Sequence, residues 1–367
     1  MKRILLLLLA AAVTTLSGAL RAQTTQKLTA NKLNEYGLIY SLPRTAIDIT
    51  VVTERTVSSP GEFSNYANRY LGLTDAVRTP GETVKVTKVI LNTRGIPDAA
   101  NRWTVQFKSG SSASMLLTDA GIPLAVNADN VTMPEGAPLP QAVPAPVSPL
   151  ETDAARQAVT LEMTRSTSLS KKAELTAQRI FEMREQRNDL ISGNSDNMPA
   201  DAGALSVALD ALNAQEAALT AMFAGTTLTS TDVNTFTVIP GAEVVSDSIV
   251  ARISPADGLV DADDLRGIPL TLTVKVLSRG ELPRNEKDEI KKFPKGGLAY
   301  VIPGTAELSV AFNGREVATA TVELAQLGCT FGIDPGLFTD RKAPMQAIFS
   351  PVTGAITSLE PVESKAE

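Results

Sequence analysis

The sequence has 367 residues, 43% hydrophobic and 4% aromatic, which is enough for two or three compact units with apolar cores. It contains no histidine, which excludes Ser-His-Asp and Cys-His triads and all histidine-ligated metal sites. The single cysteine excludes an intrachain disulfide, a thiolate cluster and a CxxC redox pair. The scarcity of Trp and Tyr disfavours a surface that stacks sugars.

Residues 1–22 have the pattern of a secretory signal peptide. Two basic residues precede an apolar run over Ile4–Val13, and cleavage is expected after Ala19 or Ala22. The apolar run is too short for a typical membrane span, and no cysteine follows it to carry a lipid anchor. Removing this segment takes away three basic residues and no acid, so the net charge moves from −6 to −9. We expect a soluble exported protein, periplasmic or extracellular, that spans no membrane and binds no nucleic acid.

Residues 23–132 are predicted to form an N-terminal β-rich domain. The segment NEYGLIYSLPRT is apolar and aromatic and is expected to end at Pro43, and Ala46–Val57 then alternates as a half-buried strand. A short helix is expected from Glu62 to Gly72, followed by a second strand over Thr83–Asn92. Together with weaker strands, these elements predict a small antiparallel sheet with one covered face. The weaker strands are Arg102–Phe107, Ala113–Thr118 and Leu124–Val126.

Residues 133–149, MPEGAPLPQAVPAPVSP, mark the clearest internal boundary. Proline at this density cannot continue a sheet or a helix, so we predict an extended, polyproline II linker. A spacer explains the segment more simply than a PxxP ligand for a partner domain. Directly after it, Ser148–Glu151 is a candidate capping box, although Val159–Met163 is equally compatible with a strand.

Residues 150–230 are predicted to contain an antiparallel helical hairpin. Its arms begin at Ser168 and Asp201, with Gly193 as the C-cap of the first arm and Asp201 as the N-cap of the second. Because an isolated pair of such arms is marginally stable, we expect their apolar stripes to face each other and a sheet. The stripes are Leu169, Ala173, Ala177, Ile180, Met183, Leu190 and Ile191, and Leu205, Leu209, Leu212, Leu219, Met222 and Phe223.

Residues 231–367 are predicted to form a C-terminal β-rich domain in which the strand pattern returns from Asn234. The charged, proline-bounded residues 279–297 are most simply a solvated loop. Asn313–Gly314 is expected to be a type I′ hairpin turn, and the final strands turn at Pro351–Gly354. The predicted fold class is therefore α+β, with antiparallel β-sheets flanking an inserted antiparallel α-helical hairpin.

Two charged clusters are candidate sites. Asp257, Asp261, Asp263 and Asp264 lack the spacing of an EF-hand loop, so turn capping explains them better than calcium binding. Arg184 and Arg187, flanked by acids in the first arm, form a pair three residues apart. We interpret this pair as a solvated ridge of ion pairs, or as a seal between hairpin and sheet, rather than as an anion clamp.

No other residues form a convincing catalytic set. Cys329 lies among small and apolar residues and is interpreted as a buried structural thiol. No G-x-S-x-G motif is present, and no glycine-rich phosphate loop follows a strand and opens a helix. We therefore assign no catalytic, cofactor-binding or metal-binding residues and expect no cofactor.

Five segments of the chain carry a resemblance to a known family. They are NEYGLIYSLP, NRYLGL, RIFEMREQRNDLISGNSDNMPAD, IVARISPADGLVDADDLRG and GLAYVIPGTAELSV, spread over nearly the whole mature chain. The sequence resembles exported proteins of gut-type Gram-negative bacteria that are classed as a domain of unknown function. This resemblance implies export and implies no activity, ligand or catalytic residue.

The absence of a catalytic set favours a non-enzymatic binding or scaffold protein of the bacterial envelope, with another envelope protein or a glycan as partner. The alternative is a carboxylate-dependent hydrolase for a glycan-type substrate, with a cation bound near Asp261. Two acids of unlike burial in a deep cleft would favour the hydrolase, whereas an exposed apolar patch or an open strand edge would favour a protein partner.

Overall fold

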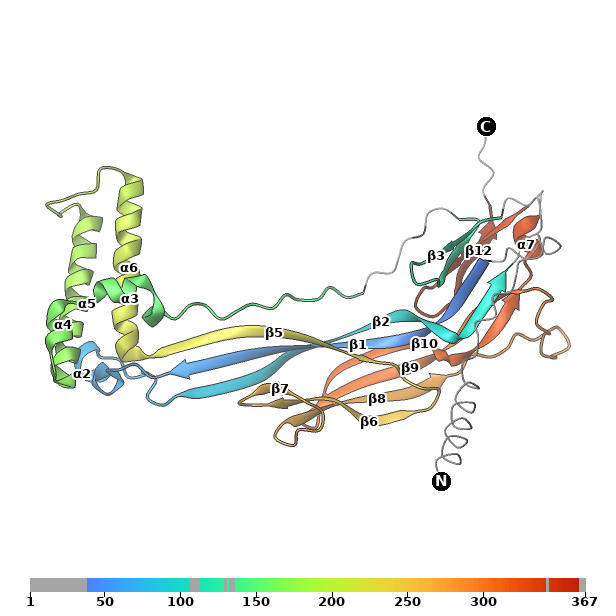
Figure 1. The fold of residues 1–367 in the computed structure, drawn as a ribbon, viewed down its shortest axis with the longest axis horizontal. Coiled ribbons are helices and arrows are strands. Elements are labelled where there is room, and N and C mark those ends of the chain that lie inside the picture. Colours follow the sequence, from blue (N-terminus) through green and yellow to red (C-terminus); the bar gives the residue numbers. More distant parts are fainter. Residues whose placement is uncertain (1–37, 106–112, 129–130, 132–135, 341–342, 363–367) are drawn as a thin grey trace, which may run out of the picture.

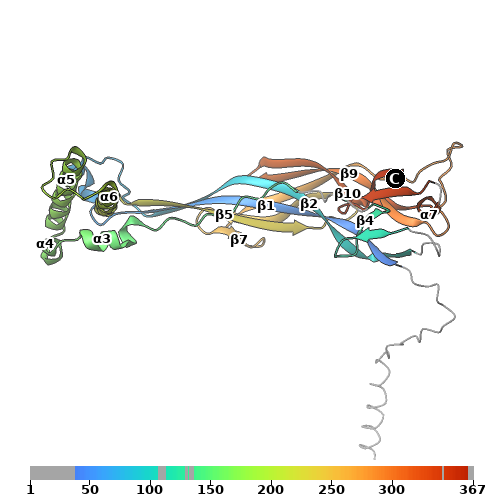
Figure 2. The ribbon, with the colours of Figure 1, turned by 90° about the horizontal axis from the view of Figure 1, so that it is seen from above.

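The computed structural model of the protein describes residues 38–105, 113–128, 131, 136–340 and 343–362. The molecule is elongated, with β-sheets at one end, helices at the other and a long three-stranded sheet between them (Figures 1 and 2). Strands make up 45% of it and helices 24%, and the strand pairs of the described part are antiparallel, which confirms the α+β class. The predicted signal peptide, residues 1–22, lies outside the described residues.

The three-stranded sheet has β1 as its central strand. Its strands, in the order β2-β1-β5, are β1 (Leu38–Ser59), β2 (Gly81–Val105) and β5 (Thr226–Val238). The middle of β1 is buried on both faces, so the prediction of a half-buried strand is wrong there. Its outward side chains bond to those of the neighbouring strands: Thr50 Oγ1 lies 2.8 Å from Thr235 Oγ1, and Thr237 Oγ1 donates to Asp48 at 2.6 Å.

The strands of this sheet are longer than predicted. β1 continues through Pro43, which was expected to end the preceding segment. The register with β2 shifts between Ser41 and Pro43, and such an irregularity tolerates a residue without an N–H group. β2 is one continuous strand where two were expected, and β5 begins at Thr226 rather than Asn234. Pairing along β1 therefore overrides the weak local signals in these segments.

A five-stranded sheet packs on the inner face of β1. Its strands, in the order β10-β9-β8-β6-β7, are β6 (Val245–Ser254), β7 (Gly258–Val260), β8 (Ile268–Ser278), β9 (Leu298–Phe312) and β10 (Arg315–Ile333). Ile47 and Ile49 of β1 join Leu272 and Leu308 in one buried core. Asn313 and Gly314 have φ of 50° and 71°, which confirms the type I′ turn between β9 and β10.

A four-stranded sheet closes the far end of the β-region. Its order is β12-β11-β4-β3, with β3 (Met115–Leu117), β4 (Pro123–Val126), β11 (Met345–Phe349) and β12 (Ile356–Pro361), and α7 (Gly336–Thr339) lies beside it. Tyr40 is buried in the core of this end, where its hydroxyl accepts from Ala299 N at 2.7 Å and donates to Ala299 O at 3.2 Å. Burial raises the pKa of Tyr40, so the phenol remains a neutral hydrogen-bonding group.

The Gln326 side chain of β10 hydrogen-bonds to β1 just beyond the end of its pairing with β5. The Gln326 amide accepts from Thr45 N at 3.0 Å and donates to Thr45 O at 2.7 Å, as a neighbouring strand would. It also contacts Pro240 O at 3.2 Å. The Thr45 hydroxyl in turn accepts from Ala325 N at 3.0 Å. These bonds satisfy buried backbone groups that have no strand partner at this position.

The helices form a compact group that we call the helical head, residues 61–77 and 148–225. Its elements are η3 (Ser64–Tyr66), α2 (Ala67–Leu71), η4 (Pro149–Glu151), α3 (Asp153–Ala158), α4 (Leu161–Arg165), α5 (Leu169–Ser192) and α6 (Ala202–Ala224). Gly193 caps the end of α5 with φ 74°, and Asp201 Oδ1 accepts from Ala204 N at 2.8 Å, which confirms both predicted caps. The residues that were compatible with a strand, Val159–Met163, instead lead into α4, which Thr160 caps.

The core of the head is built from helices, so the expectation that the apolar stripes also face a sheet is wrong. Phe63, Ala177, Ile180 and Phe223 are buried there together, and Phe63 and Phe223 pack with ring centroids 5.3 Å apart. The short helices η3, α2 and α3 occupy the place expected for the sheet. They were predicted only in part, because helices this short give weak periodic signals.

The proline-rich segment 136–148 runs from the β-region to the head beside the long sheet (Figure 1). Ala137 N donates to Asn92 Oδ1 at 2.8 Å, and Val143 forms an isolated antiparallel bridge with Thr231 of β5. Apart from that bridge, residues 136–148 form no helix or strand, as their proline content predicts.

Candidate functional site

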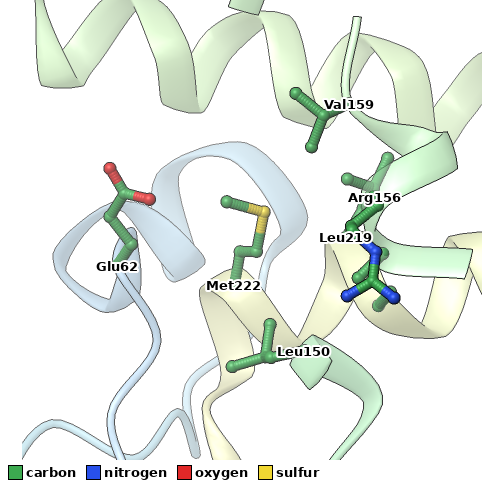
Figure 3. Close-up of a pocket in the computed structure, with 8 residues that line it drawn as sticks. Glu62, Leu150, Arg156, Val159, Leu219 and Met222 are labelled. Carbon is green, nitrogen blue, oxygen red and sulfur yellow. The ribbon is translucent and has the colours of Figure 1, made fainter. Parts of the chain in front are cut away.

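A pocket of about 330 Å³ opens in the helical head. Its floor is apolar and consists of Leu150, Val159, Leu219 and Met222. Glu62 and Arg156 stand on opposite sides of Met222, one acid and one base at the rim (Figure 3). These residues come from the segment before η3, from η4 and α3, and from the last turns of α6.

One wall of the pocket is set by the turn that follows β1. Phe63 N donates to Met222 O at 2.7 Å, and Val77 N donates to Ala224 O at 2.8 Å, so this segment is bonded to the end of α6. Gly61 lies so close that a Cβ atom there would be 2.2 Å from Met222 O. Only glycine permits this approach, and it places Glu62 beside the pocket.

The opposite wall is set by two capped turns. Leu150 N donates to the Ser148 hydroxyl at 3.3 Å, and Ala155 N donates to the Thr152 hydroxyl at 3.3 Å. These caps fix η4 and α3, which present Leu150 and Arg156 to the pocket. Ser148 was predicted as the start of a capping box, and it caps the 3-10 turn η4 instead of a longer helix.

The two charged side chains of this pocket differ in their partners. Arg156 pairs with the neighbouring Asp153, whereas Glu62 is exposed and has no ion partner in the described part of the chain. Among the residues that the structure describes, no second carboxylate, serine or thiol lines the pocket. An apolar floor with a separate acid and base suits an apolar side chain flanked by charges.

A second pocket, of about 340 Å³, lies between α4 and α5 and contains two carboxylates. Glu182 accepts from Arg179 Nη1 at 3.2 Å and from Gln178 Nε2 at 3.3 Å. Glu162, on α4, is exposed. Both acids remain accessible to water, whereas a general acid in glycoside hydrolysis requires a carboxyl group shielded from it.

Two of the four acids of the predicted acidic cluster, Asp257 and Asp264, pair with Arg266. The Arg266 guanidinium lies 2.6 Å from an Asp264 carboxylate oxygen and 3.4 Å from one of Asp257. Its hydrogen bonds lower the pKa of Asp264 to about 2. Within the described residues, no three acids or cysteines converge to hold a metal ion.

Arg184 and Arg187 both reach across to α6. Arg184 Nε donates to Glu216 Oε1 at 2.6 Å, and Arg187 Nη1 pairs with Glu216 Oε2. Glu216 is largely buried, so one carboxylate joins two arginines and fastens α5 to α6. The prediction of a solvated ridge or a seal to the sheet is therefore wrong: both arginines pair with Glu216 of α6 and join helix to helix.

Cys329 is half-buried, so its interpretation as a buried structural thiol is wrong in its burial. It lines a polar pocket of about 300 Å³ together with Arg44 and Asp98. Burial raises the pKa of the Cys329 thiol, which disfavours the thiolate that a nucleophile needs.

The residues of the head pocket were not recognised as a site from the sequence. Leu219 and Met222 were predicted on the α6 stripe, which gave them only a packing role. Glu62 and Arg156 lie far apart in the sequence and belong to no motif. Only the head's tertiary structure brings them together.

Comparison with known proteins gives one match. The sequence pattern of a family described as a domain of unknown function, DUF4831, matches residues 36–357. No curated protein and no solved structure matches the chain. In the described part of the chain, no helix combines the length and apolar character needed to span a membrane.

Proposed function

This chain belongs to the DUF4831 family, and we propose that it is an exported, non-enzymatic binding or scaffold protein of the bacterial envelope. The signal-like pattern of residues 1–22 and the resemblance to exported proteins of gut-type Gram-negative bacteria support the location. Residues 23–132 and 231–367 are proposed as two β-rich parts, with the 150–230 hairpin inserted between them after the 133–149 linker.

The observation that carries the binding role is the placement of an apolar pocket at the end of a long sheet. The head stands away from the five-stranded and four-stranded sheets, joined by three strands and the segment 136–148 (Figure 1). Such an arrangement leaves the pocket accessible to a large partner. No aromatic side chain of the described ranges lines the pocket, which favours a protein segment over a glycan.

The ligand best suited to the pocket is a short apolar segment of another envelope protein with a basic residue beside it. The apolar floor would bury its side chain, and the unpaired Glu62 carboxylate would accept its charge. This binding mode needs no cofactor or metal.

The test is a pull-down from envelope extracts with matched variants. Val159→Asp places a charge in the head pocket, whereas Leu161→Asp places one two residues later, in the second pocket. Both side chains are exposed, so neither change should unfold the head. The proposal expects that a partner recovered by the wild type is lost with Val159→Asp and kept with Leu161→Asp.

The alternative is a carboxylate-dependent hydrolase that uses Glu162 and Glu182, which share the second pocket although both are accessible to water. It is tested by incubating the protein with a glycan library. Turnover that Glu182→Gln abolishes, with no partner recovered in the pull-down, would replace the binding role by the hydrolase.

A further inference from the structure

The distal parts of α5 and α6 project beyond the core of the head. We call residues 189–210, which include the turn between the helices, the hairpin tip. Val207 is 70% exposed and Ile191 is 66% exposed, and Met198 in the turn is exposed as well. Large apolar side chains gathered at one projecting end are typical of a surface that binds another protein.

The hairpin tip is also uniformly acidic. No lysine or arginine occurs between residues 188 and 224. Asp189, Asp196 and Asp210 have no ion partner in the described part of the chain. A partner for this surface must therefore combine apolar side chains with positive charge, which excludes an anionic membrane or a nucleic acid.

A surface of that kind exists on the same chain, in residues 290–295, IKKFPK, which we call the basic loop. Lys291, Lys292 and Lys295 are exposed and have no ion partner among the described residues. Ile290 is 55% exposed and Phe293 is 41% exposed. The Phe293 ring stacks on Trp103 with centroids 5.6 Å apart, which anchors the loop to the body of the protein.

We propose that the hairpin tip of one molecule binds the basic loop of a second copy. The apolar side chains would meet, and the three lysines would face the unpaired aspartates. The two surfaces lie at opposite ends of the elongated molecule, so a chain cannot satisfy its own contact (Figures 1 and 2). A contact between unlike surfaces leaves one of each free after every addition, so copies add head to tail until the chain of molecules closes into a ring or continues as a filament.

This contact uses no residue that lines the head pocket, so it stands apart from the proposed function. The pocket lies near the end of α6 that meets β5, whereas the tip is formed by the opposite end of the hairpin. A head pocket that fails to bind a partner would leave the association of copies unaffected, and the reverse also holds.

Sedimentation velocity of the purified mature chain provides the test. The mean sedimentation coefficient should rise with protein concentration at about 0.05 M NaCl and should fall toward the monomer value at about 0.5 M, because salt screens exposed charges. A wild-type protein that stays monomeric at low salt up to its solubility limit overturns the proposal.

Charge reversal identifies the two surfaces. Lys291→Glu with Lys292→Glu, or Asp196→Lys with Asp210→Lys, should weaken association at least about tenfold. The control is Lys85→Glu with Lys88→Glu on β2, which changes the net charge as the loop variant does, and it should leave association within about twofold of the wild type.

Mixing the two variants distinguishes a direct contact from damage to the fold. Each variant keeps one native surface, and the reversed surfaces also complement each other, so an equimolar mixture should associate as the wild type does. A mixture that remains monomeric overturns the proposal, and so does a control variant that loses association.

Discussion

The helical head and the β-region bury their side chains in different ways. In the part of the molecule made of β-sheets, side chains of β1 belong to two hydrophobic cores. β1 pairs with β2, which precedes the two long helices in the sequence, and with β5, which follows them. In the head, one core is made from helices and the turns beside them, and three strands and the segment 136–148 join the head to the rest. We infer that the head can open as a separate cooperative unit while the sheets stay folded.

Phe223→Ala should give the largest difference in stability between the head and the β-sheets. Phe223 is fully buried and packs on Phe63, so its loss should cost about 4 kcal/mol of head stability. Hydrogen exchange should show faster exchange in α5 and α6 and unchanged protection in β8 and β9.

Phe181→Ala is the matched control, because Phe181 is 51% exposed on α5 and should cost less than about 1 kcal/mol. Loss of protection in β9 as large as in α6 would show that head and sheets unfold together.

Gln326→Leu should produce the opposite pattern. The variant leaves Thr45 N and Thr45 O without partners at a place where no strand replaces them, at a cost of about 2 kcal/mol. The β-region should lose protection around β1 and β10 while the head core keeps its own.

The check is the same exchange experiment, with Glu323→Leu as control because that exposed side chain on β10 has no partner in the described part of the chain. Equal destabilisation by both variants would show that the hydrogen bonds from Gln326 to Thr45 do not account for the loss of stability.

Glu216→Gln tests how much the ion pairs between α5 and α6 contribute to the stability of the head. The change removes the charge that Arg184 and Arg187 share, and partial exposure of the arginines limits the cost to about 1 kcal/mol. Exchange should quicken where α5 faces α6 and should remain slow in α2. Glu185→Gln, on an exposed acid of α5 without an ion partner among the described residues, should have no effect.

Local chemistry made some features of the fold predictable. Gly193, Asp201 and the Asn313–Gly314 turn were each identified from the backbone geometry that these residue types favour. The α+β class followed from the alternation of Val, Ile and Thr in most of the chain and the apolar stripes between residues 168 and 225. Each of these signals lies within a few residues of the feature that it specifies.

Strand partners and the site could not be obtained in this way. β1 pairs with β5, and β4 with β11, across more than a hundred residues, and alternation within one strand does not identify its partner. The burial of β1 on both faces depends on that pairing. The same holds for Glu62 and Arg156, which face one pocket only because Gly61 and the capped turns bring their segments against α6.

The smallest effect is expected in the acidic cluster, where Asp257 and Asp264 pair with the exposed Arg266. Arg266 lowers the pKa of Asp264 from 3.8 to about 2, so Arg266→Gln should raise it toward 3.8 in an NMR titration of the carboxyl carbon. Because the folded-state pKa is the lower one, the stabilising contribution is complete above pH 3.8 and is lost as the pH falls toward 2. Both carboxylates next to Arg266 already face a cation, so millimolar calcium should leave the melting temperature unchanged. A clear rise in melting temperature with calcium would mean that the cluster binds the ion, and an Asp264 pKa unchanged in Arg266→Gln would mean that Arg266 does not cause the shift.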